Sequence, residues 1–173
     1  VDVELTCADK PLAKLTANFV GEHHGLSSEL GQAPQLPDAT SLPDPRTMGL
    51  PTDGLFGRVE YRMAEVPGWA VGKPSGDPTS ILWQRLDDDA VIDWPALGLL
   101  CDSAPPPIME LGDLTSLTVQ LTVHFHRLPE PRTWVASKFT TRHVTDGFHE
   151  EDGELWDSNG NLLAQSRQLA ILL

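Results

Sequence analysis

The chain has 173 residues, of which 40% are apolar and 21% are charged, as is typical of a globular protein with one good-sized core. Its 25 acidic and 12 basic residues give a net charge of −13, which argues against general binding to nucleic acid or to anionic membranes. No run of about 18 apolar residues occurs, so we expect no membrane span. The two cysteines, Cys7 and Cys101, form neither a disulfide framework nor a zinc pattern, which favours a reducing, cytoplasmic location.

The N-terminal third divides into two parts. Residues 1–5 and 12–20 are predicted to be strands joined by a turn, because apolar and polar side chains alternate in the second of them. Residues 21–54 are rich in proline and lack any lasting period. A structureless loop of this length is uncommon inside one compact domain, so we interpret it as a linker between two modules.

The rest of the chain predicts an antiparallel sheet wrapped around one helix, an α+β fold. Two strands are expected at residues 55–63 and 79–86. A helix is expected at 93–104, with Asp93 as its N-cap, Pro95 in its first turn and three prolines ending it. Gly98 within this helix would allow close approach to a sheet. Four more strands, joined by hairpin turns, are expected at residues 116–126, 134–143, 148–156 and 162–172.

Three polar residues stand in otherwise apolar elements: Asp102, Thr122 and Gln168. Together, a carboxylate, a hydroxyl and an amide could hold one water molecule and activate it as a nucleophile. A carboxylate at the end of a helix faces the negative end of the dipole, so stability alone would prefer a cation there. The ordinary alternative for Asp102 is a solvent-facing residue in a turn.

The two strand residues have ordinary alternatives as well. Gln168 is in phase with the small residues Ala164, Ser166 and Ala170, which would let a helix pack closely, but it could equally be an exposed strand glutamine. Thr122 is in phase with polar residues and opposite the apolar series from Leu117 to Phe125, so we expect it on the outer face or at an interface between domains.

Three segments resemble the acyl-CoA thioesterase II (TesB-like) family. They are residues 97–102 (LGLLCD), 117–127 (LTVQLTVHFHR) and 153–173 (GELWDSNGNLLAQSRQLAILL). The resemblance implies a hotdog fold and places the family's catalytic aspartate, hydroxyl residue and glutamine on Asp102, Thr122 and Gln168. The chain departs from the family pattern at Gln120-Leu121, where a well-known member has Asp-His.

Members of that family are typically double hotdogs. By this resemblance, residues 1–20 are remnant strands of a first hotdog, 21–54 are a Pro-rich linker, and 55–173 are a complete second hotdog. The resemblance also implies association, either with a copy of the same chain or with a missing N-terminal hotdog half.

The function that we expect is hydrolysis of acyl-CoA to free fatty acid and CoA by water that Asp102 activates. The alternative is a non-catalytic hotdog module that binds acyl-CoA or a partner. A hydratase or dehydratase fits less well, because its usual Asp-His or Glu-His pair is not clear near Asp102.

Other candidate groups give weaker signals. Arg127, Arg132 and Lys138 could contact the phosphates of CoA, or could be ordinary surface charges. His124 and His126 share a strand face but have no evident third ligand, so we expect no metal, and no cofactor is expected either. The sequence contains no Gly-x-Ser-x-Gly elbow and no phosphate-binding glycine loop.

Overall fold

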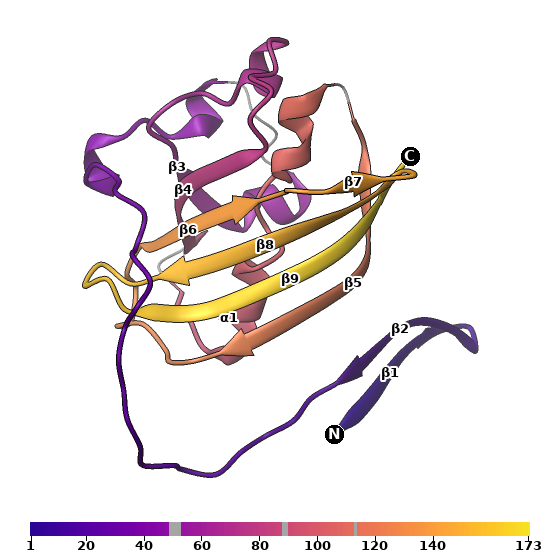
Figure 1. The fold of residues 1–173 in the computed structure, drawn as a ribbon, viewed down its shortest axis with the longest axis vertical. Coiled ribbons are helices and arrows are strands. Elements are labelled where there is room, and N and C mark those ends of the chain that lie inside the picture. The colour runs from indigo at the N-terminus through magenta and orange to yellow at the C-terminus, as the bar shows by residue number, and fades with distance from the viewer. Residues whose placement is uncertain (49–52, 88–89, 113) are drawn as a thin grey trace.

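A curved antiparallel sheet with one helix against its inner face dominates the computed structural model (Figure 1). The structure describes residues 1–48, 53–87, 90–112 and 114–173. Within these residues, the strand order is β3-β4-β6-β8-β9-β5, with the short β7 paired to β8. The strands are β3 (Val59–Arg62), β4 (Thr79–Leu86), β5 (Ser116–Phe125), β6 (Val135–Thr140), β7 (Val144–Thr145), β8 (Phe148–Trp156) and β9 (Leu162–Leu172). This arrangement confirms the predicted α+β hotdog architecture.

Helix α1 (Trp94–Leu100) packs against the sheet as its sequence predicts. The Asp93 side chain caps it by accepting a hydrogen bond from the Ala96 amide at 2.9 Å. Leu97 and Leu100 are fully buried in the main core. A Cβ atom at Gly98 would lie only 3.4 Å from the Phe125 ring, so the glycine lets the helix approach β5 closely.

The helix is shorter than the predicted range of 93–104. It ends at Leu100, with Cys101 as its C-cap, and the chain continues as a turn toward the prolines. The apolar spacing of Cys101 and Ala104 therefore indicates that these residues are packed against the core, not that they are helical. Cys101 is buried, and Ala104 packs against the core from a non-helical segment. This early ending frees Asp102 from the helix and lets it turn toward the sheet.

The N-terminal strands form a separate hairpin. Strands β1 (Asp2–Cys7) and β2 (Lys10–Thr16) pair only with each other in the described part of the chain, and all their residues are exposed. Figure 1 shows the hairpin set apart from the main sheet. Its apolar side chains, including Leu5 and Leu12 at 61% and 64% exposure, have no core of their own.

The predicted linker is partly ordered against the outer face of the sheet. The Trp83 indole donates a hydrogen bond to the Pro37 carbonyl at 2.9 Å, and Ala39 is buried. A Cβ atom at Gly31 would lie 2.8 Å from the Trp156 ring, so this segment lies directly on the sheet. Residues 49–52 of the linker lie outside the described residues.

Short 3-10 helices occur at Ala39–Ser41, Pro45–Met48, Gly54–Gly57, Gly68–Val71 and Pro107–Leu111. Among the described residues, no helix has the length and hydropathy needed to cross a bilayer.

Candidate active site

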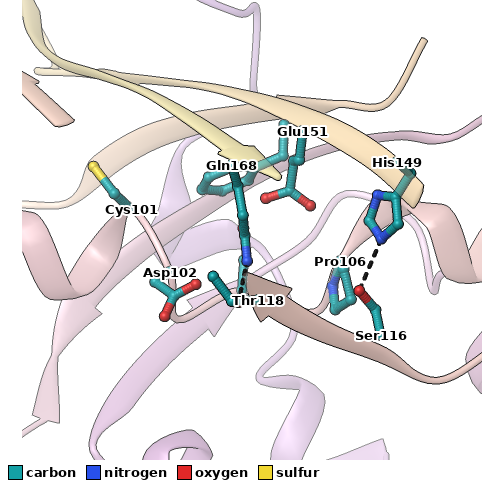
Figure 2. A pocket seen from close by; sticks show the side chains of 10 residues that line it. Cys101, Asp102, Pro106, Ser116, Thr118, His149, Glu151 and Gln168 are labelled. Atoms are coloured by element: carbon teal, nitrogen blue, oxygen red, sulfur yellow. Dashed lines mark hydrogen bonds between the residues drawn. The ribbon is translucent and has the colours of Figure 1, made fainter. Parts of the chain in front are cut away.

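A small polar pocket lies between the end of α1 and the inner face of the sheet. Its volume is about 170 Å³, and its walls come from the turn after α1 and from β5, β6, β8 and β9 (Figure 2). The polar side chains that line it are Asp102, Ser116, Thr118, His149, Glu151 and Gln168. The pocket therefore collects carboxyl, amide, hydroxyl and imidazole groups from distant parts of the sequence.

The register of β8 and β9 explains why Glu151 and Gln168 share the pocket. The two residues are direct cross-strand partners, so their side chains stand next to each other on one face of the sheet. On β9, Ala164, Ser166 and Ala170 are buried on that same face, as the alternation of the sequence predicts. Gln168 is the one long polar side chain in this row of small residues.

A β-bulge in β5 decides which threonine enters the pocket. The pairing with β9 shifts between Thr118 and Gln120, which leaves Val119 as an extra residue. Thr118 lies before the bulge and lines the pocket, whereas Val123, after the bulge, packs against the core. The extra residue reverses the alternation along the strand. Without it, the even-numbered residues after Thr118 would face inward; with it, Val123 and its odd-numbered neighbours do.

The structure places Thr122 outside the pocket. Thr122 pairs with Arg167, whose exposed side chain binds Asp152 on the outer face at 2.6 Å. Of the three predicted site residues, Asp102 and Gln168 come together, and Thr118 occupies the place that the family resemblance assigned to Thr122. Thr122 lies on the outer face, which is one of the two positions that the alternation of its strand predicts.

Gln168 links the other two groups. Its amide nitrogen donates a hydrogen bond to the hydroxyl of Thr118, and its amide also acts on the Asp102 carboxyl group, whose pKa it lowers. Burial of the Asp102 carboxyl group raises its pKa, and the amide of Gln168 opposes part of this rise. Asp102 as a residue is nevertheless exposed, so its carboxylate lies at the mouth of the pocket, where water can reach it.

Glu151 and His149 are pocket residues that sequence reasoning missed. Glu151 is 7% exposed, and burial together with the charge of Asp102 raises its pKa to about 8. His149 is 2% exposed, and its Nε2 atom lies 2.8 Å from the hydroxyl oxygen of Ser116. Burial lowers the pKa of His149, so its imidazole is neutral at neutral pH. The available signal was the phase of 148–156, in which both residues fall on the face of buried Leu155.

A second, apolar cavity adjoins the polar pocket. It has a volume of about 350 Å³ and shares Pro106 and Ser116 with the pocket. Apolar and aromatic side chains dominate its walls, namely Tyr61, Met63, Trp69, Met109 and Leu114. A polar pocket that opens beside an apolar cavity suits a substrate with a reactive polar group and an apolar tail.

The residues considered for phosphate or metal binding line neither cavity. Arg127, Arg132 and Lys138 line neither cavity, and the CoA-phosphate role remains a prediction. His126 lies 3.3 Å from the side-chain oxygen of Gln165. In the described ranges, no group of three His, Cys, Asp or Glu side chains is arranged to hold a metal ion.

The fold and the pocket together define a hotdog protein with a carboxylate, an amide and a hydroxyl on its inner face. Residues 31–172 match the sequence model of the acyl-CoA thioesterase C-terminal domain, and the chain belongs to this family. No curated protein sequence matches the chain.

Solved structures agree with this assignment. A putative thioesterase II from Thermobifida fusca is 28% identical with a TM-score of 0.70, over 87% of this chain and 57% of its own. A putative thioesterase from Novosphingobium aromaticivorans is 25% identical with a TM-score of 0.71, over 88% and 59%. A hotdog protein of unknown function from Alicyclobacillus acidocaldarius shares the fold with a TM-score of 0.74 at 21% identity, over 88% and 58%. The chain thus spans less than three fifths of the length of each of these proteins.

Proposed function

We propose that the protein hydrolyses acyl-CoA thioesters to free fatty acid and CoA, through a water molecule that Asp102 activates. The observation that carries this proposal is the convergence of Asp102, Gln168 and Thr118 on one pocket. Two of the similar structures are titled putative thioesterases, and the family model describes the C-terminal domain of acyl-CoA thioesterases.

In the proposed reaction, the Asp102 carboxylate takes a proton from water as the water oxygen attacks the thioester carbon. The side-chain oxygen of Gln168 accepts a hydrogen bond from that water and orients it, while Thr118 holds the Gln168 amide in place. The tetrahedral intermediate then collapses with loss of the C–S bond. The thiolate leaves and receives the proton that Asp102 holds, so the carboxylate is restored.

The apolar cavity supports an acyl substrate in particular. It lies directly beside the polar pocket, with Pro106 and Ser116 as the shared wall. Its volume of about 350 Å³ falls in the range of small-molecule sites, which is about 300–1,000 Å³. We place the acyl chain there and the thioester carbonyl in the polar pocket.

Asp102→Asn tests the mechanism, with release of free thiol from acyl-CoAs of several lengths as the measurement. We expect a loss of about 10²-fold or more, because an amide cannot accept the proton. Thr118→Ala and Thr122→Ala form a matched pair on one strand. The first should lower activity because Gln168 loses its partner, and the second should not. Full activity of Asp102→Asn, with folding intact, would contradict the proposal.

A non-catalytic binding module is the second candidate, and the openness of the site favours it. Asp102 and Thr118 are both exposed, so a further surface is needed to close the pocket around a substrate. Binding of acyl-CoA by calorimetry, without release of thiol by the wild-type chain, would select this candidate.

We also propose that another hotdog domain supplies this surface, either in a second copy or in an N-terminal half. Strand β5 is at the edge of the sheet, and its Leu117 and Val119 are 57% and 56% exposed. An apolar edge strand is a ready template for pairing with another strand. The apolar β1–β2 hairpin needs a partner for the same reason. The mass of the native particle, compared with 18.9 kDa for one chain, tests self-association. We further propose that the protein is cytoplasmic. Both cysteines are free thiols, as is usual for proteins of a reducing compartment.

A further inference from the structure

Glu151 is a buried acid whose position the proposed hydrolysis does not yet use. It projects from β8 into the space between Gln168 and His149, with Asp102 across the pocket (Figure 2). Its side chain is almost fully enclosed, and its Oε2 atom has no hydrogen-bond partner among the described residues. An unpartnered polar atom that is buried in the wall of a pocket indicates a position for a ligand group.

The groups that face Glu151 keep it in its acid form. The turn after α1 contributes the negative charge of Asp102 and the thiol of Cys101, whose pKa burial raises to about 12. Strand β8 contributes the neutral imidazole of His149, and β9 contributes the uncharged amide of Gln168. Strand β5 contributes only the hydroxyls of Ser116 and Thr118, and β6 contributes the Phe139 ring. No cation is among the side chains that line the pocket in the described part of the chain.

We propose that Glu151 is a second catalytic carboxyl group, which remains protonated and donates a hydrogen bond to the carbonyl oxygen of the thioester. This inference rests on the proposed function. Asp102 and Glu151 then have complementary roles, in which the open carboxylate accepts a proton from water and the enclosed carboxylic acid stabilises the oxyanion. The proton of Glu151 stays on Glu151 throughout, so the proton balance of the hydrolysis is unchanged.

The hydrogen bond from Glu151 would be stronger in the transition state than in the ground state. As water attacks, negative charge develops on the carbonyl oxygen, and a donor in a water-poor pocket stabilises that charge more than the neutral carbonyl. An ionised Glu151 would instead repel the oxyanion. The activity of the wild-type protein should therefore fall as Glu151 ionises, near pH 8.

Three variants test this role. Glu151→Gln keeps a neutral donor of the same shape but cannot ionise, whereas Glu151→Leu removes the donor. Glu154→Gln is the matched control, because it makes the same change on the same strand with the side chain on the opposite face, paired with Lys138 and Gln165. Near-ultraviolet circular dichroism checks the fold of each variant.

Two measurements decide the outcome. The pH dependence of kcat/KM should show an alkaline decline near pH 8 in the wild type and in Glu154→Gln, and none in Glu151→Gln. Glu151→Gln should keep most of the activity at pH 7, and Glu151→Leu should lose about 10²–10³-fold. In the absence of substrate, the infrared band of a carboxylic acid should persist at pH 7, disappear near pH 8, and be missing in Glu151→Gln.

Several results would overturn the role of Glu151. They are an alkaline decline that persists in Glu151→Gln, a loss in Glu151→Gln as large as that in Glu151→Leu, full activity of Glu151→Leu, or no acid band at pH 7. If Glu151→Leu does not fold, Glu151→Gln alone still decides, through its pH profile and its missing band. A wild-type protein that releases no thiol overturns the proposed function together with this role, whereas the four results above overturn this role alone.

Discussion

The free energy of unfolding should depend on pH through Glu151, and Glu151→Gln should remove that dependence. Folding raises the pKa of Glu151 from its ordinary value of 4.5 to about 8. Between these values the folded chain holds a proton that the unfolded chain has lost, so stability falls as pH rises through this window. The loss is complete only above pH 8. At about 1.4 kcal/mol per unit, it amounts to about 5 kcal/mol.

The assay compares the wild type, Glu151→Gln and Glu154→Gln by urea unfolding at pH 5, 7 and 9. The variant Glu151→Gln should gain about 4 kcal/mol relative to wild type between pH 5 and pH 9. In thermal unfolding, 1 kcal/mol shifts Tm by about 2–4 °C for a chain of this size, so the Tm difference between Glu151→Gln and the wild type should change by roughly 10 °C between pH 5 and pH 9. Glu154→Gln should follow the wild type. If Glu151→Gln and the wild type run parallel across this range, the burial of a protonated acid at this position is refuted.

Two further predictions concern packing around the site. Gly153→Ala should lower the free energy of unfolding, measured in urea, by about 1–3 kcal/mol. The reason is that the added Cβ atom would lie 2.3 Å from the Ser166 hydroxyl and 2.9 Å from the Phe139 ring. An unchanged free energy of unfolding would contradict this packing. Met109→Trp should narrow the apolar cavity, so kcat/KM should fall more for long acyl chains than for short ones. An equal effect on all chain lengths would mean that the acyl chain lies elsewhere.

The order of elements could be predicted because each local pattern agrees with the fold. The Asp93 cap, Pro95 in the first turn and the hairpin turns each depend on a few neighbouring residues, and the structure has the strands of the main sheet close to the expected ranges, except that residues 55–57 form a 3-10 helix. The end of α1 was placed too late, since Cys101 and Ala104 continue the apolar spacing while the backbone already leaves the helix. A pattern of burial cannot by itself distinguish a last helical turn from a packed irregular segment.

The small neighbours of Gln168 in phase favoured the inner face, although an exposed position stayed open, and the structure has Ala164, Ser166 and Ala170 buried on the face of the pocket. Glu151 could not be found in this way. It stands in the run Glu150-Glu151-Asp152, which has the composition of a solvated surface. The phase of 148–156 puts the middle carboxylate of the three on the face of Leu155, and the register of β8 with β9 then sets it beside Gln168 in the pocket.

The choice between Thr118 and Thr122 shows how one inserted residue determines the chemistry of the pocket. Leu121 is the direct partner of Gln168, and Thr118 pairs with Ala170, two residues further along β9. With a regular β5, the inward phase set by Val123 and Phe125 would bring Val119 rather than Thr118 opposite Ala170, and the Gln168 amide would lose its hydroxyl partner. The bulge at Val119 resolves this conflict by turning Thr118 inward while the apolar residues after it still pack against α1. The same bulge leaves Val119 itself exposed at the open edge of the sheet. The proposed catalytic geometry and the proposed contact with another hotdog therefore depend on the same local irregularity, and deletion of Val119 should disturb both.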